Sequence, residues 1–168
     1  MSDINALIAG ARNIPLLEGA YLDDARWDDW LALYASDCVY WIPTWRSEED
    51  LTTDPQTELS HIYYASRAGL EDRVLRIRST HSPATVPIRR TCHSIGNVLL
   101  TRGPDQSGAS LRTAWTCHVF DPRHKKSYVL FGSALYQLRL QGELWSITHK
   151  KTIVQNDYLP SMVDVYCL

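Results

Sequence analysis

The sequence lacks the features that identify several large classes of protein. No apolar run approaches the roughly 20 residues that a membrane-spanning helix needs, and the N-terminus has neither the basic start nor the long apolar segment of a signal peptide. The formal net charge is only −2, so no cationic field is available for nucleic-acid phosphates. Neither G-x-G-x-x-G nor G-x-x-x-x-G-K-[ST] occurs, which leaves nucleotide binding by the usual loops unsupported. We therefore expect a cytoplasmic protein that binds neither membrane nor nucleic acid.

Cysteine is present but not in pairs that suggest a metal or redox site. The chain contains no C-x-x-C, and its four cysteines are widely spaced: Cys38, Cys92, Cys117 and Cys167. In a chain without a secretion signal, such thiols are usually reduced and buried. We expect no disulfide framework.

Phenylalanine is scarce (2 residues), whereas the chain has 6 Trp and 9 Tyr, several of them within residues 18–45. Asp24 can cap a helix over residues 25–35. This helix would carry one apolar stripe at i, i+3, i+4 and i+7: Trp27, Trp30, Leu31 and Tyr34. A strand over residues 38–42 follows and ends at Pro43. A stripe built from tryptophans needs a broad concave surface to cover, which predicts a curved sheet.

The remaining pattern predicts further helices and strands on both sides of this segment. Asn13 and Pro15 can open a first helix, preceded by a short helix or loose arm over residues 1–12. Downstream we expect a polar surface loop (46–56), a strand (60–65), a helix (67–79) and four long strands (89–101, 111–120, 127–140 and 144–155). The strand at 127–140 is apolar on both faces near its middle, as is typical of a central strand covered on both sides.

Long antiparallel strands twist and curl, and helices then pack into the concave side. The order of elements therefore predicts an α+β fold, and residues 1–168 read as a single domain without a repeat or linker.

Two spacings could suggest a metal site. Glu58-x-x-His61 has the spacing of di-iron carboxylate bundles, but it occurs once and beside a predicted strand, so a surface pair is the better interpretation. His118-x-x-Asp121-x-x-His124 contains the two histidines and carboxylate that can bind iron(II). Because Asp121 begins a hairpin turn, these side chains should splay apart. We expect no metal ligand on this chain.

A proton-transfer site is harder to dismiss. His93, His118 and His149 lie on three strands of one predicted sheet, and Asp23 or Asp37 could pair with one of them as a general base inside the cone. The sequence does not fix which face each histidine occupies, and paired structural histidines are the more common case. The adjacent pairs Cys92-His93 and Cys117-His118 are not metal chelates, because adjacent residues on a strand point to opposite faces.

Several segments resemble the small (β) subunits of aromatic-ring-hydroxylating dioxygenases. The similarity begins in EGAYLDDARWDDWLALYASDCVYWIPTW and continues through DPQTELSHIYYASRAGLEDRVLRI, RSTHSPATVPIRRTCHSIGNV and KKTIVQND, so that it covers about residues 14–157. The middle block is most similar to the benzoate, toluate and anthranilate group of these enzymes.

This resemblance implies a cystatin-like or NTF2-like α+β cone, with N-terminal helices packed into a strongly curved, mainly antiparallel sheet. It also implies a large (α) partner subunit that carries a Rieske [2Fe–2S] cluster, mononuclear Fe(II) and the substrate, commonly in an α3β3 hexamer. The chain itself has neither C-x-H nor C-x-x-H, so it cannot be that large subunit. The resemblance carries over no catalytic, cofactor-binding or metal-binding residue, and we expect none here.

The function expected from the resemblance is that of a non-catalytic subunit. Its complex would dihydroxylate a carboxylated single-ring aromatic, with O2 and electrons from NAD(P)H delivered by a reductase. We expect the convex sheet face and the apolar tail Tyr158–Leu168 to contact other subunits. One alternative is a free-standing isomerase, dehydratase or hydrolase of the same fold that uses an in-cone His–Asp or Tyr pair. Another is a ligand-binding or scaffolding module without an oxygenase partner.

Overall fold

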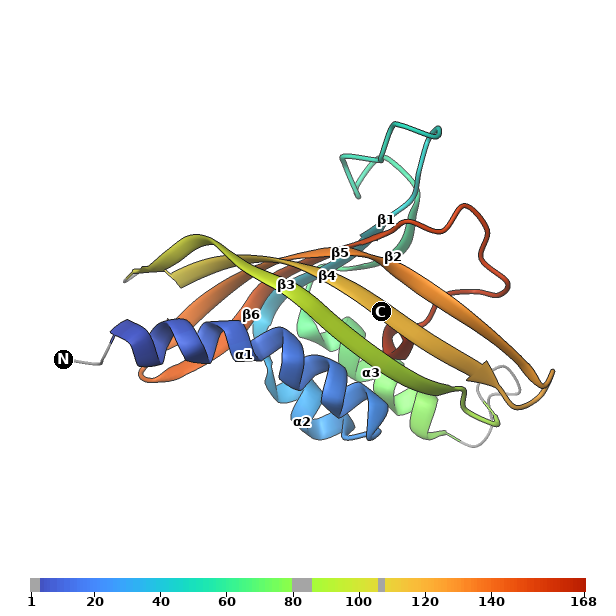
Figure 1. Ribbon diagram of the computed structural model, residues 1–168, viewed down its shortest axis with the longest axis horizontal. Coiled ribbons are helices and arrows are strands. Elements are labelled where there is room, and N and C mark those ends of the chain that lie inside the picture. Colours follow the sequence, from blue (N-terminus) through green and yellow to red (C-terminus); the bar gives the residue numbers. More distant parts are fainter. Residues whose placement is uncertain (1–3, 80–85, 106–107) are drawn as a thin grey trace.

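The computed structural model describes residues 4–79, 86–105 and 108–168 (Figure 1). Its elements, in chain order, are α1 (Ile4–Asp23), α2 (Trp27–Ala32), β1 (Tyr34–Pro43), β2 (Ser60–Tyr64), α3 (Arg67–Arg78), β3 (Arg90–Asp105), β4 (Gly108–Asp121), β5 (Lys126–Gln141), β6 (Leu144–Val154) and the 3-10 turn η1 (Val165–Cys167).

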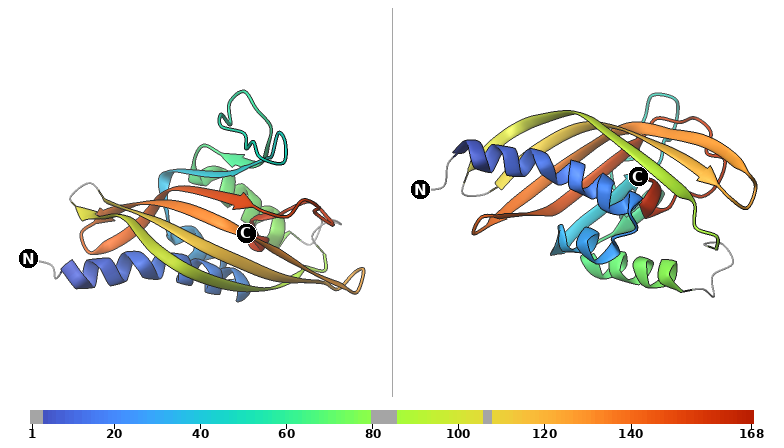
Figure 2. Two further views of the ribbon diagram at one scale, coloured as in Figure 1. Left: turned by 45° about the horizontal axis from the view of Figure 1, so that its top comes forward. Right: turned by 60° about the horizontal axis from the view of Figure 1, so that its bottom comes forward.

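The strands form one six-stranded sheet in the order β2-β1-β6-β5-β4-β3. The β1–β6 pair is parallel and the other pairs are antiparallel. The long strands arch over the three helices, which all lie on the concave side (Figures 1 and 2). The predicted α+β cone with a curved, mainly antiparallel sheet is confirmed.

The first helix is longer than the sequence predicted. Residues 4–12 are part of α1 rather than a short separate helix or loose arm, and Pro15 lies inside the helix. Tertiary contacts explain this extension, because Ala11 and Ile14 are buried against the core and Trp145 Nε1 donates to the Leu7 carbonyl at 3.1 Å. Packing of one apolar face therefore outweighs the weak local signal at Pro15.

The second helix is shorter than predicted, and the proposed Asp24 cap is wrong. Arg26 occupies the N-cap position and no side chain caps the helix. The Asp24 amide instead bonds to Ala20 at the end of α1 (3.0 Å), and Ala25 has a left-handed backbone (φ 53°) that separates the two helices. Tyr34 belongs to β1, yet its side chain enters the same core as those of Trp27 and Trp30.

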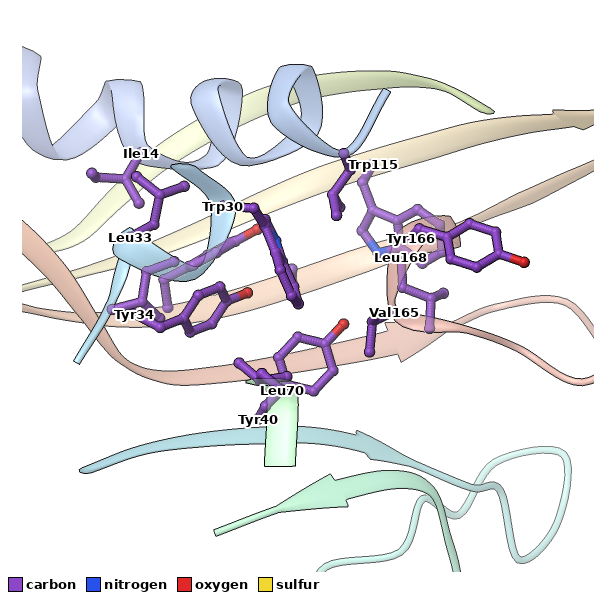
Figure 3. Packing of buried hydrophobic residues seen from close by; sticks show 14 of the residues in the cluster. Ile14, Trp30, Leu33, Tyr34, Tyr40, Leu70, Trp115, Val165, Tyr166 and Leu168 are labelled. Carbon is purple, nitrogen blue, oxygen red and sulfur yellow. The ribbon is translucent and has the colours of Figure 1, made fainter. Parts of the chain in front are cut away.

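Aromatic rings fill the centre of the cone (Figure 3). Trp30 meets Tyr34 and Tyr40 edge-on, with ring centroids 5.3 Å and 6.4 Å away. Leu70, Val74 and Ile77 of α3 are buried, as their spacing predicted. The tryptophan stripe therefore packs against the curved sheet as expected.

The end of the chain docks onto its own core. Val165, Tyr166, Cys167 and Leu168 are all buried. Asp164 fixes this segment to α3, because it accepts from Arg73 Nε at 2.8 Å. These last four residues are therefore covered mainly by the chain itself. Tyr158 and Met162 are exposed, and a contact through that part of the tail stays a prediction.

No helix within the described ranges is long and apolar enough to cross a membrane. The expected cytoplasmic location stays a prediction.

Gly132 tests how tightly the central strands pack. A Cβ atom at Gly132 on β5 would lie 1.9 Å from the Ile153 carbonyl oxygen, whereas one at Gly96 on β3 would meet nothing within 4 Å. Gly132→Ala should lower the free energy of unfolding by about 3 kcal/mol, because backbone must move. Gly96→Ala, the control, should change it by less than about 1 kcal/mol. Equal denaturation midpoints for the two variants would contradict this packing.

Candidate functional site

A buried carboxylate lies at the centre of the cone. Glu18 of α1 is 2% exposed. Four side chains from other elements donate to it: Tyr34, Tyr136 (2.7 Å), Trp30 (3.4 Å) and Lys150 (2.9 Å). Burial, followed by the charge of Glu18, raises the pKa of Tyr34 and of Tyr136 well above the usual range. Both phenols therefore stay protonated and act as donors.

Lys150 of β6 supplies the balancing charge. Its ammonium donates to Glu18 and to the Leu168 backbone oxygen at 3.1 Å, and it lies 5.5 Å and 5.6 Å from the ring centroids of Tyr40 and Tyr136. A buried charge is tolerated when it is paired and hydrogen-bonded. This pair meets both conditions, so its groups are already engaged in holding the interior together.

A His–Asp pair lies next to this network. His93 Nδ1 on β3 is 2.6 Å from Asp23 Oδ1 at the end of α1. The same carboxylate accepts from the His93 amide (2.7 Å) and from Thr91 Oγ1 (2.9 Å). Burial disfavours ionisation of Asp23, but these hydrogen bonds, led by that of the His93 side chain, outweigh it and lower its pKa. The structure thus pairs Asp23 with His93. The sequence named both residues as candidates but did not specify which histidine and which aspartate would pair.

Space, rather than geometry, limits what this pair can do. The cavity beside His93 has a volume of about 10 Å³. Small-molecule sites commonly measure about 300 Å³ or more. Trp115, Leu168 and Ile95 are among the side chains that fill the space. An organic substrate does not fit in the cavity next to His93, and the pocket on the Asp23 side of the dyad, about 170 Å³, is also smaller than such sites.

The other proposed partners lie elsewhere. His118 and His149 point to the outer face of the sheet, where their strand partners are Val129 and Gln137. Asp37 forms a surface ion pair with Arg139 at 2.8 Å. The three histidines therefore do not converge on one site.

The carboxylates of the two candidate metal motifs are engaged in local loop and turn hydrogen bonds, and His61 and His118 lie on β2 and β4. Glu58 accepts from the amides of Thr53 (2.7 Å) and Asp54 (2.8 Å). Asp121 accepts from the amide and ring of His124, and the ring hydrogen bond is the main cause that lowers the Asp121 pKa to about 2. No group of three or more His, Cys, Asp and Glu side chains in the described part of the chain could bind a metal ion. That the chain has no catalytic, cofactor or metal residue stays a prediction.

The cysteines are free thiols, and three of the four are buried, as expected. Desolvation raises the pKa of Cys38 to about 11 and that of Cys167 to about 12. Such thiols are poor nucleophiles.

The outer face of the sheet carries exposed apolar side chains. Val129, Phe131 and Leu135 on β5 are 40%, 46% and 39% exposed, so the central strand is not covered on both sides by the described chain. We call these three residues the β5 apolar strip. Sequence periodicity detected the apolar residues, but nothing in a single chain indicates what covers them.

A groove of about 220 Å³ adjoins the β5 apolar strip. Val39, Trp41 and Leu135 form its apolar walls together with Lys151. The Lys151 ammonium lies 4.4 Å from the Trp41 ring centroid, and desolvation lowers its pKa. It forms no ion pair with a carboxylate of the described residues. This half-buried cation is therefore suited to an acidic group from outside.

Comparison with known proteins agrees with the observed fold. A family model described as "Ring hydroxylating beta subunit" matches residues 18–161. The beta subunit of toluate 1,2-dioxygenase from Pseudomonas putida is 41% identical over 149 residues, which are 89% of this chain and 90% of that protein. The beta subunit of benzoate 1,2-dioxygenase from Acinetobacter baylyi is 40% identical (89% and 86%). A crystal structure of the benzoate 1,2-dioxygenase beta subunit from Burkholderia mallei superposes with a TM-score of 0.76 at 34% identity (95% and 96%).

The coupling between Glu18 and Lys150 can be tested through the free energy of unfolding. Lys150→Met should lower the free energy of unfolding by about 3–5 kcal/mol, because Glu18 is left as an unpaired buried charge. Adding Glu18→Gln should restore part of that loss in a double-mutant cycle followed by urea denaturation. Arg139→Met breaks the exposed pair with Asp37 and, as the control, should cost less than about 1 kcal/mol. Additive losses at Lys150 and Glu18 would contradict their coupling.

Proposed function

Because the chain belongs to the ring-hydroxylating beta-subunit family and is a beta subunit of a ring-hydroxylating dioxygenase, we propose that its role is to hold that assembly together. A large (α) subunit carries the Rieske [2Fe–2S] cluster, the mononuclear Fe(II) and the substrate. The observation that best supports this division of roles is the contrast between the concave interior and the outer face of the sheet. The interior is filled and its central charges are paired, whereas the outer sheet face carries uncovered apolar side chains.

The proposed reaction of the whole complex is dihydroxylation of a carboxylated single-ring aromatic. The named substrates of the two relatives, toluate and benzoate, support this class. O2 and electrons from NAD(P)H, delivered by a reductase, complete the reaction. We propose an α3β3 hexamer as the stoichiometry.

The contact to the large subunit is proposed to lie on the β5 apolar strip and the adjoining Lys151 groove. Uncovered apolar side chains in the middle of a sheet are typical of interaction surfaces. Lys151 adds a charge preference, because a half-desolvated ammonium without a carboxylate partner favours an acidic side chain from the other subunit. Trp41 beneath it is the kind of aromatic residue that concentrates binding energy.

The free-standing enzyme is less well supported. A His–Asp pair does lie in the cone, but the neighbouring cavity of about 10 Å³ leaves no room for an organic substrate. A binding module without an oxygenase partner leaves the β5 apolar strip unexplained.

Phe131→Glu tests the proposed contact. Co-expression with the tagged large subunit should recover the wild-type chain, and the variant should reduce recovery at least about tenfold, since a buried carboxylate replaces an apolar contact. Leu144→Glu, on a hairpin end that is 77% exposed, is the control and should leave recovery unchanged.

Two results would contradict different parts of the proposal. A wild-type chain that stays monomeric and never co-purifies with the large subunit would contradict the assembly role. Normal recovery of the Phe131→Glu variant would contradict the location of the contact.

A further inference from the structure

Three buried polar atoms without a protein partner belong to residues that line the same small cavity. They are His93 Nε2 on β3, Trp115 Nε1 on β4 and Thr152 Oγ1 on β6, and none has a hydrogen-bond partner within the described residues. Each of these side chains is at most 4% exposed. Because buried polar groups in folded proteins are nearly always satisfied, three such atoms at one cavity indicate a bound partner.

The three atoms differ in hydrogen-bonding character. The Trp115 indole can only donate. His93 Nδ1 faces the Asp23 carboxylate, which accepts, so Nδ1 carries a proton, and in the neutral ring Nε2 then presents a lone pair. The Thr152 hydroxyl can donate or accept. A single molecule that both donates and accepts is therefore required.

The cavity volume limits that molecule to one water. About 10 Å³ is close to the smallest volume that admits a water molecule, and a buried water usually has two to four polar partners. A metal cation would be repelled by the Trp115 N–H and by the nearby Lys150 ammonium. An anion would be repelled by the His93 lone pair.

We propose that His93, Trp115 and Thr152 form a built binding site for one internal water molecule. The water donates to His93 Nε2 and Thr152 Oγ1 and accepts from Trp115 Nε1. Two strands separate β6 from β3 in the sheet, so the water joins strands that share no backbone hydrogen bonds. The site braces the concave side of the cone, and the Asp23–His93 pair orients the water instead of acting on a substrate.

Gly19 of α1 supports the proposed position of His93. A Cβ atom at Gly19 would lie 3.1 Å from His93 Cβ, so the glycine lets the helix approach β3 closely. Asp23, one helical turn further on, then reaches the ring. The imidazole is therefore held from two sides with Nε2 free to bind the water.

The test is a crystal structure of the full chain combined with oxygen-17 relaxation dispersion, which counts long-lived internal waters. The wild type should show one density peak within about 3.2 Å of all three atoms. Trp115→Phe keeps the ring but removes the donor, and it should lose this peak and one long-lived water. Thr113→Val is the matched control, because Thr113 is also a buried, unpartnered threonine but does not line the cavity. It should keep the peak.

Several results would overturn the proposal. These are an empty cavity in the wild type, a peak of unchanged occupancy in Trp115→Phe, or loss of the peak in Thr113→Val. If Trp115→Phe does not fold, Thr152→Val takes its place, and an occupancy that is not at least halved in that variant overturns the site. None of these outcomes depends on recovery of the large subunit, so the water site and the assembly role fail separately.

Discussion

The rest of the structure depends on one buried ion pair. Glu18 and Lys150 lie 132 positions apart in the chain, and their hydrogen bonds join two helices, three strands and Leu168. In a low-dielectric interior a half-satisfied network would be costlier than an apolar core. The carboxylate therefore allows α1 a single position, in which Tyr34, Tyr136 and Lys150 all reach it. The arrangement of the helices under the sheet follows from that requirement.

The need to satisfy the buried Glu18 carboxylate also makes the two faces of the sheet different in composition. Tyrosines, tryptophans and a paired charge occupy the concave side, where the cavity next to the Glu18 network is of the size of a water molecule. Among the described residues, the convex side shows no such buried network, and it carries the β5 apolar strip and Lys151. A fold that encloses a substrate pocket in other proteins can thus serve as a rigid body that presents a sheet to a partner.

The sequence predicted much of the fold, because periodicity and turn residues are local signals. The helix predicted at 67–79 is observed as Arg67–Arg78, and the four long strands were placed within a few residues except for the longer β3. The break between α1 and α2 was placed within about two residues, but its cause, the left-handed backbone of Ala25 rather than an Asp24 cap, was missed. The family resemblance, rather than periodicity, supplied the name of the fold and the partner.

The central site could not be predicted, for a reason visible in β6. Simple alternation from Trp145 and Ile147 would place His149 on the core face and Lys150 outside. The pairing between β5 and β6 shifts register at Gln137/Leu138, and this irregularity turns Lys150 inward and His149 outward. One extra residue in a strand reverses every later side chain. Asp23 and His93 were both named as candidates, but their pairing required the packing of α1 on β3.

The burial of Val165–Leu168 has a consequence for the order of folding. Leu168 contacts the lysine that balances Glu18, so the core is complete only after this segment has docked. Until then the concave side of the sheet stays open, and during that interval the chain is most exposed to aggregation. Docking of a short segment, rather than pairing of the last strand, therefore completes the folded body that meets a partner.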